Sequence, residues 1–189
     1  MMGLLGNVAE VPELRPKLMT KEFVEEFANL LDSCKDGIEV SYNAAGVLAH
    51  MACDGAQAWS IKQPEREEVL GRMSRAINRW EIMSKRNINY RSFAPIICLA
   101  GVSHTPQCQM WAVWALANLT SVTPEKYCRL VVQEGGLDLM EELLNDNSEQ
   151  VRTSMAQVRQ WAGVVRANVR EWQESGAEDI ELENLEFDG

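Results

Sequence analysis

Apolar residues recur at every third or fourth position along most of the chain, and strict alternation of apolar and polar residues is nearly absent. The first pattern is typical of amphipathic α-helices, whereas alternation would indicate strands. The sequence therefore predicts an all-α fold. The expected helices span 21–31, 40–52, 64–80, 90–99, 107–122, 124–133, 137–144 and 148–173.

Local signals mark several helix ends and separate buried helices from surface ones. Thr20 stands where an N-cap is needed, and Gly135-Gly136 separates two short helices. Pro95 interrupts the segment 90–99. The segments 40–52 and 107–122 are rich in alanine and apolar on nearly every side, which predicts that both helices are buried.

Three apolar segments with small side chains align without gaps, and each has a polar residue at the same place. They are 3–9, 46–52 and 114–120, with Asn7, His50 and Asn118 at the shared position. Asn7 and His50 are 43 residues apart, within the ~40–47 residue period of armadillo and HEAT repeats. His50 and Asn118 are 68 apart, which fits neither one period nor two, so the segment between them is expected to be an irregular repeat.

These features predict armadillo-like helical repeats stacked into a right-handed superhelix. The repeats are expected over 1–145, with an incomplete first repeat and the irregular one at about 54–105. A C-terminal amphipathic helix over 146–175 and an acidic, disordered tail over 176–189 are expected to follow.

The net charge of −10, from 28 acidic and 18 basic residues, is concentrated at one end. The segment 171–189 holds eight acids and no Lys or Arg, so the remaining residues are close to neutral. Basic residues between Arg66 and Arg91 alternate with acidic ones and lack interleaved aromatics, which favours a solvated face over a nucleic-acid site. No apolar run approaches the ~20 residues that span a membrane, so neither nucleic acid nor a membrane is expected as a partner.

The five cysteines are odd in number, widely spaced and form no C-x-x-C pair. This suits free thiols in a reducing cytosol or nucleus. His104 and Cys108 have the spacing of a metal-ligand pair but lack a second pair nearby, so no metal or cofactor is expected. A Cys–His nucleophile pair has no local signature here, and the usual nucleotide-binding and hydrolase motifs are absent, so no catalysis is expected.

Longer stretches resemble a known family. The segment 131–144 (VVQEGGLDLMEELL) is similar to the first two helices of an armadillo repeat, and 42–52 and 110–120 are similar to its third helix. More narrowly, the chain resembles the C-terminal part of the Zyg-eleven and Zer-one family, closest to its Zer-one branch. The stretches that carry this are LLGNVAEVPELRPKLM, GIEVSYNAAGVLAH, RNINYRSF, WAVWAL and KYCRLVVQEGG, within residues 3–145.

The resemblance implies a substrate receptor of a cullin-2 RING ubiquitin ligase. Such receptors bind client proteins whose N-terminus begins with glycine, and an Asn and a Glu one turn later help to hold the terminal ammonium. Those residues map onto Asn7 and Glu10. The corresponding faces of the next repeats would present Asn43 and His50, then Trp111, Trp114 and Asn118. Gly3 and Gly46 are expected to let the peptide backbone come close.

The family pocket also uses a Trp, an Asn and an Asp from the preceding repeat, which this sequence lacks. The segment that binds the elongin–cullin-2 complex is absent too. The sequence is therefore expected to be either a fragment of a receptor or a product that has lost half the pocket. The segment 1–10 resembles a third helix without the two helices that precede it in a repeat, which favours a fragment. The expected location is the cytoplasm and possibly also the nucleus. The alternative is a generic armadillo scaffold that binds an extended peptide or a partner helix without a free N-terminus.

Overall fold

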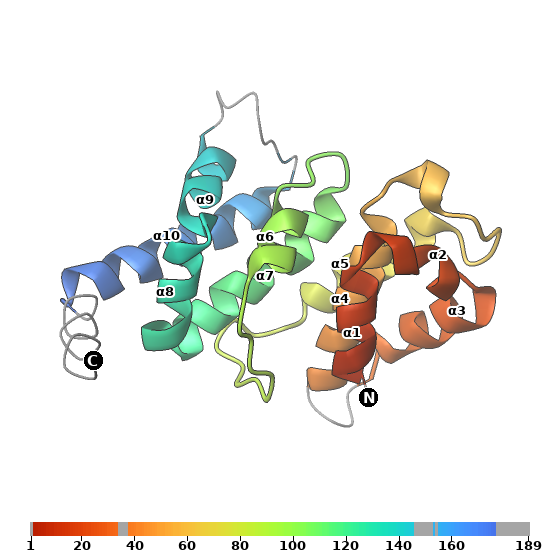
Figure 1. Ribbon diagram of the computed structural model, residues 1–189, viewed down its shortest axis with the longest axis horizontal. Helices are drawn as coiled ribbons and strands as arrows, with labels where there is room; N and C mark the ends of the chain where they lie inside the picture. Colours follow the sequence, from red (N-terminus) through yellow and green to blue (C-terminus); the bar gives the residue numbers. More distant parts are fainter. Residues whose placement is uncertain (1, 34–37, 146–152, 154, 177–189) are drawn as a thin grey trace.

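The computed structural model describes residues 2–33, 38–145, 153 and 155–176. This part of the chain contains α-helices, two 3-10 helices and no strand (Figure 1). The prediction of an all-α repeat fold is confirmed. The elements are α1 Met2–Glu10, η1 Pro12–Leu14, α2 Arg15–Leu18, α3 Lys21–Leu30, α4 Glu39–Ala52, η2 Ala56–Ala58, α5 Arg66–Ile77, α6 Ala94–Ala100, α7 Pro106–Val122, α8 Pro124–Gln133, α9 Gly136–Leu144 and α10 Ala156–Glu174.

The helices follow one another along the long axis of the molecule. Helices α1 to α5 form one end, α6 and α7 lie in the middle, and α8 to α10 form the other end (Figure 1). None of the helices in the described ranges combines the length and apolarity needed to cross a bilayer.

Most predicted helices form within one or two residues of their expected bounds, and three differ. The helix expected over 64–80 ends at Ile77. Pro95 lies in the first turn of α6 rather than interrupting a helix, because proline lacks only an N–H that is unpaired there anyway. The last helix begins at Ala156 rather than in the segment 148–155, part of which lies outside the described residues. The acidic tail from 177 onward also lies outside them.

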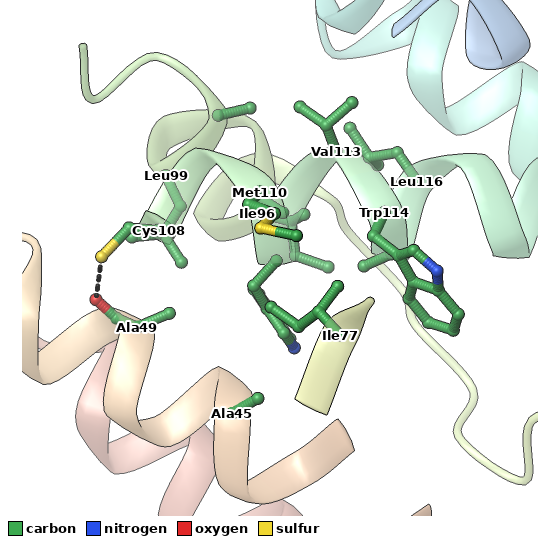
Figure 2. Close-up of a cluster of buried hydrophobic side chains, with 14 of the residues drawn as sticks. Ala45, Ala49, Ile77, Ile96, Leu99, Cys108, Met110, Val113, Trp114 and Leu116 are labelled. Atoms are coloured by element: carbon green, nitrogen blue, oxygen red, sulfur yellow. Dashed lines mark hydrogen bonds between the residues drawn. The ribbon is translucent and has the colours of Figure 1, made fainter. Parts of the chain in front are cut away.

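Helix α7 is the centre of the core, as its composition predicts. Every residue from Cys108 to Thr120 is buried, and α4, α5, α6, α8 and α10 pack around it. Alanines on α4 and α7 let the two backbones approach, and larger side chains fill the remaining space. Figure 2 shows this cluster, in which Ile77, Met110 and Trp114 lie between the helices.

Candidate functional site: a pocket between the first and fourth helices

A small pocket of about 40 Å³ lies where α1 and α4 meet. Its remaining wall comes from α7 and from the connection between α5 and α6. The lining residues are Gly6, Asn7, Glu10, Tyr42, Asn43, Gly46, Val47, His50, Ile88, Tyr90 and Trp111. A second cleft of about 710 Å³ shares Asn7, Glu10, Ile88 and Tyr90 with the pocket and continues toward α6. The pocket therefore opens into a longer groove.

Five of the seven residues expected to bind peptide line this pocket. They are Asn7, Glu10, Asn43, His50 and Trp111. Asn7 is exposed, Glu10 is half-buried and His50 is buried, which gives the pocket an open rim and a deep end. Their role in binding stays a prediction.

The other two expected residues, Trp114 and Asn118, lie in the core instead. Both side chains are fully buried. The connection between α5 and α6 crosses this face of α7: the indole of Trp80 packs edge-on against that of Trp114, with ring centroids 4.9 Å apart. The side-chain amide of Asn118 donates to the carbonyls of Ile82 and Ser84. The placement of Trp114 and Asn118 in the groove is therefore wrong.

Gly46 also has a different role from the expected one. A Cβ atom there would lie 2.6 Å from Cζ2 of Trp111, so glycine makes room for the indole rather than for a peptide. The other glycine of the pocket wall, Gly6, is different, because no described atom lies within 4 Å of the Cβ position. The surroundings of Gly3, the other glycine expected to lie against the peptide backbone, are outside the described part of the structure.

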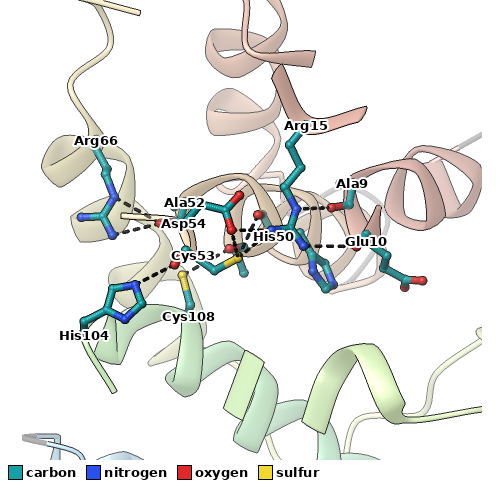
Figure 3. Close-up of polar contacts among 11 residues, drawn as sticks. Ala9, Glu10, Arg15, His50, Ala52, Cys53, Asp54, Arg66, His104 and Cys108 are labelled. Atoms are coloured by element: carbon teal, nitrogen blue, oxygen red, sulfur yellow. Dashed lines mark hydrogen bonds and ion pairs between the residues drawn. The ribbon is translucent and has the colours of Figure 1, made fainter. Parts of the chain in front are cut away.

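Among the described residues, Glu10 is the only carboxylate that lines the pocket. Within the described part of the chain its carboxylate has no hydrogen bond or ion pair, and Figure 3 shows it turned away from Arg15. Desolvation by partial burial raises the pKa of Glu10 above its ordinary value of 4.5. An unpaired carboxylate at the C-terminal end of a helix also faces the negative end of the helix dipole, so it does not stabilise α1.

His50 forms the deep end of the pocket. Its side chain is 4% exposed, and Nδ1 has no hydrogen-bond partner among the described residues. Its ring meets that of Trp111 edge-on. Burial, and to a lesser extent the nearby Arg15 guanidinium, lowers the pKa of His50 to about 4, while Asp54 opposes this shift. The imidazole is therefore neutral at physiological pH and offers a nitrogen lone pair or a single N–H.

Arg15 fixes α1 relative to α4, a role that the sequence analysis missed. Its guanidinium donates to the carbonyls of Ala9 and Glu10 at the end of α1, at 2.8 and 3.1 Å. It also pairs with Asp54 at 2.7 Å and contacts Sγ of Cys53 at 3.2 Å (Figure 3). Arg15 donates hydrogen bonds to carbonyls that α1 leaves unpaired, and it pairs with Asp54 just after α4. It therefore holds the end of α1, and with it Glu10, against α4.

The two candidate metal ligands are used for capping. His104 Nε2 lies 2.8 Å from the carbonyl oxygen of Cys53, and Sγ of Cys108 donates to the carbonyl of Ala49 at 3.2 Å. Arg66 donates to the carbonyl of Ala52 at 2.9 Å, so three side chains satisfy the end of α4 (Figure 3). The described ranges contain no group of three or more side chains placed to hold a metal ion.

The connection between α5 and α6 is held over the pocket by a buried cation. Arg86 stacks on the ring of Tyr42, 3.6 Å from its centroid, and pairs with Glu39 at 3.2 Å. The hydroxyls of Tyr42 and Tyr90 lie 2.7 Å apart. The Arg86 side chain is only 2% exposed, so the expectation of a solvated basic face is wrong at this residue.

Comparison with known proteins identifies the family of this chain. The family description "Protein zer-1 homolog-like, C-terminal domain" matches residues 1–170. The chain is 58% identical to the protein zer-1 homolog of Drosophila melanogaster, over 78% of this chain and 22% of that protein. It is 58% identical to the protein zer-1 homolog of Homo sapiens, over 76% and 19%. It is 48% identical to Zyg eleven-related protein 1 of Caenorhabditis elegans, over 90% and 18%.

The chain spans about a fifth of the length of these relatives. The matched region contains α1 to α9 and nearly all of α10, and it therefore includes every residue of the pocket. The chain belongs to the Zyg-eleven and Zer-one family and carries its zer-1-like C-terminal domain.

Proposed function

We propose that the pocket between α1 and α4 binds the free N-terminus of client proteins whose first residue is glycine. The observation that carries this proposal is the unpaired Glu10 carboxylate at the rim of a pocket whose deep end holds an unpaired His50 nitrogen. A terminal ammonium is a cation with three donors. Glu10 supplies the opposite charge, and Asn7 and His50 supply further acceptors.

The size of the pocket supports glycine as the first residue. A water-sized group needs about 10–15 Å³ of such space. A pocket of about 40 Å³ therefore admits about three such groups. That corresponds to an ammonium, a Cα and a carbonyl carbon, with little room for a side chain.

Family membership supports the wider role. We propose that the chain is the non-catalytic, substrate-binding part of a cullin-2 RING ubiquitin ligase receptor, acting in the cytoplasm and possibly the nucleus. Contacts with the cullin-2–elongin complex would come from regions outside this chain. Ubiquitin transfer would be the work of those partners.

The test is calorimetric titration of the chain with the hexapeptide Gly-Ala-Ala-Ala-Ala-Trp, with its N-terminus free or acetylated. We expect acetylation to abolish binding, because it removes the positive charge. Glu10→Gln should weaken binding by about 2–5 kcal/mol, as when one partner of a desolvated ion pair is removed. Glu13→Gln, at an exposed acid of η1, is the matched control and should leave affinity unchanged.

The pH dependence of the same titration gives a second readout. Affinity should fall as the pH drops through the raised pKa of Glu10, and also as it rises past ~8, where a terminal amine loses its proton. Equal affinity of the free and acetylated peptides would exclude amine capture and favour a scaffold that binds internal peptide segments.

A further inference from the structure

The segment 85–92, here called the strap, is the part of the α5–α6 connection that borders both cavities. It is the yellow-green stretch before α6 in Figure 1. From Glu81 to Arg91, exposed and half-buried residues alternate at every position, and residues 84–90 form neither helix nor turn. This alternation is typical of an extended chain, in which successive side chains point to opposite faces.

The strap backbone is largely unpaired within the described part of the chain. Between residues 85 and 92 no backbone group bonds to another backbone group. Two of its backbone groups bond to side chains: the N–H of Asn87 donates to Glu39, and the carbonyl of Ile88 accepts from the hydroxyl of Tyr127. An extended segment with unpaired N–H and C=O groups is a template for pairing with another strand.

The strap presents its backbone to the larger cleft. Five consecutive residues, 88 to 92, line that cleft. A strand that faced a cavity with one side-chain face would contribute alternate residues only, so a continuous run indicates that the edge of the strand lines it. The rest of the lining comes from Asn7 and Glu10 of α1 and from residues 94–96 at the start of α6.

The two side-chain contacts show which neighbouring helix each edge of the strap faces. In an extended chain, the backbone groups of residues i and i+2 point to the same edge. The backbone N–H of Asn87 points toward Glu39 of α4, so the N–H groups of Asn89 and of Arg91, where the extended stretch ends in a bend, share that direction. Ile88 points toward Tyr127 of α8. Helix α1 packs against α4, and Asn89 and Arg91 line the same cleft as Asn7 and Glu10, so we assign the edge of Asn89 and Arg91 to the side of α1.

We infer that the residues following the N-terminal glycine of a client bind in the larger cleft as a β-strand, paired with the backbone of Asn89 and Arg91. This inference rests on the proposed function, because the shared wall of the two cavities makes the cleft the continuation of the amine pocket. The partner is an extended, unfolded N-terminal segment. Backbone pairing tolerates many side chains and rejects residues that lack an N–H, such as proline.

The test is an N-methyl scan of Gly-Ala-Ala-Ala-Ala-Trp, with each of the four alanines replaced in turn by N-methylalanine. We expect alternate positions to lose about tenfold or more in affinity and the positions between them to change little, because only every second amide faces the strap. Losses of equal size at all positions, or of less than twofold at every position, would overturn the pairing.

The acetylated peptide in the same series separates the two proposals. If acetylation abolishes binding while N-methylation has no effect, amine capture stands and strand pairing falls. If acetylation has no effect, the proposed function itself falls. On the protein side, Arg91→Pro removes one strap N–H at the cleft and should weaken binding about tenfold, whereas Lys85→Pro, in the strap but outside the lining of both cavities, should not. Equal affinities of these two variants would contradict the assignment of this edge.

Discussion

Helices α4 and α7 occupy equivalent positions in the repeat pattern, yet one presents its polar positions to a pocket and the other has them covered. On α4, Asn43 and His50 line the pocket. On α7, Trp114 and Asn118 are covered by the α5–α6 connection. A repeated sequence pattern therefore predicts which face of each helix carries the polar positions. The segment packed against that face decides whether the face can bind a ligand.

The largest expected change in stability is on the face of α7 that the α5–α6 connection covers. Trp114→Ala should lower the free energy of unfolding by about 3–5 kcal/mol, as large-to-small changes in a core do. Urea denaturation of the chain measures this. A loss below about 1 kcal/mol would mean that the indole is not packed beneath the connection.

Asn118 of α7 and Asn43 of α4 compare an asparagine on the covered face with one on the open face. Asn118→Ala removes the donor for two carbonyls and should destabilise the chain by about 2–3 kcal/mol. Asn43 bonds only the carbonyl of Glu39 in its own helix, so Asn43→Ala should cost less than about 1 kcal/mol. Equal losses in urea denaturation would contradict the difference between the covered and the open face.

On the open side, the buried His50 of α4 predicts that the free energy of unfolding depends on pH. Its pKa is about 4 in the folded chain and returns to about 6.5 on unfolding. Between these values the unfolded state binds more protons, so the stability present above pH 6.5 is lost as the pH falls toward 4. We expect a loss of about 2 kcal/mol between pH 7.5 and pH 5, and His50→Gln should remove it.

Glu10 acts in the opposite direction, which makes the His50 assignment testable. Its pKa is raised on folding, so the folded state takes up its proton more readily and gains stability as the pH falls. A stability loss on acidification that persisted in His50→Gln would therefore show that another group is responsible.

The two pocket glycines give the smallest effect on stability and the sharpest contrast. Gly46→Ala places a methyl against Trp111, an overpacking that costs ~1–3 kcal/mol and is partly offset by the better helix propensity of alanine. The net loss should be about 1 kcal/mol. Gly6→Ala has open space and should stabilise α1 by ~0.5–1 kcal/mol. The same sign for both in thermal unfolding would contradict the geometry of the pocket.

Much of the fold follows from local signals in the sequence. The period of apolar residues placed nearly every helix, and Thr20 caps α3 as expected, accepting from the N–H of Phe23. The alanine content of 40–52 and 107–122 indicated the two helices of the core. The alignment of Asn7 with His50 brought together residues that line one pocket.

The remaining parts depend on contacts between distant segments. Nothing local in the sequence distinguishes His50 from Asn118, because the α5–α6 connection covers only one of them. Arg86 belongs to a mixed run of charges, and its burial follows from Glu39 and Tyr42, more than forty residues away. One partial signal was available: three of the five even-numbered positions of 82–90 are apolar or aromatic, at Ile82, Ile88 and Tyr90, which favours an extended segment.

The most direct test of the central claim is calorimetric titration of Gly-Ala-Ala-Ala-Ala-Trp into Gly6→Ala. Gly6 lines this pocket of about 40 Å³, and a methyl added there meets no described side chain within 4 Å. Gly71→Ala, in α5 and away from both cavities, is the control. We predict at least a tenfold loss of affinity in Gly6→Ala, with unfolding stability kept or increased, and no loss in Gly71→Ala. Unchanged affinity in Gly6→Ala would contradict the binding of the peptide N-terminus in this pocket.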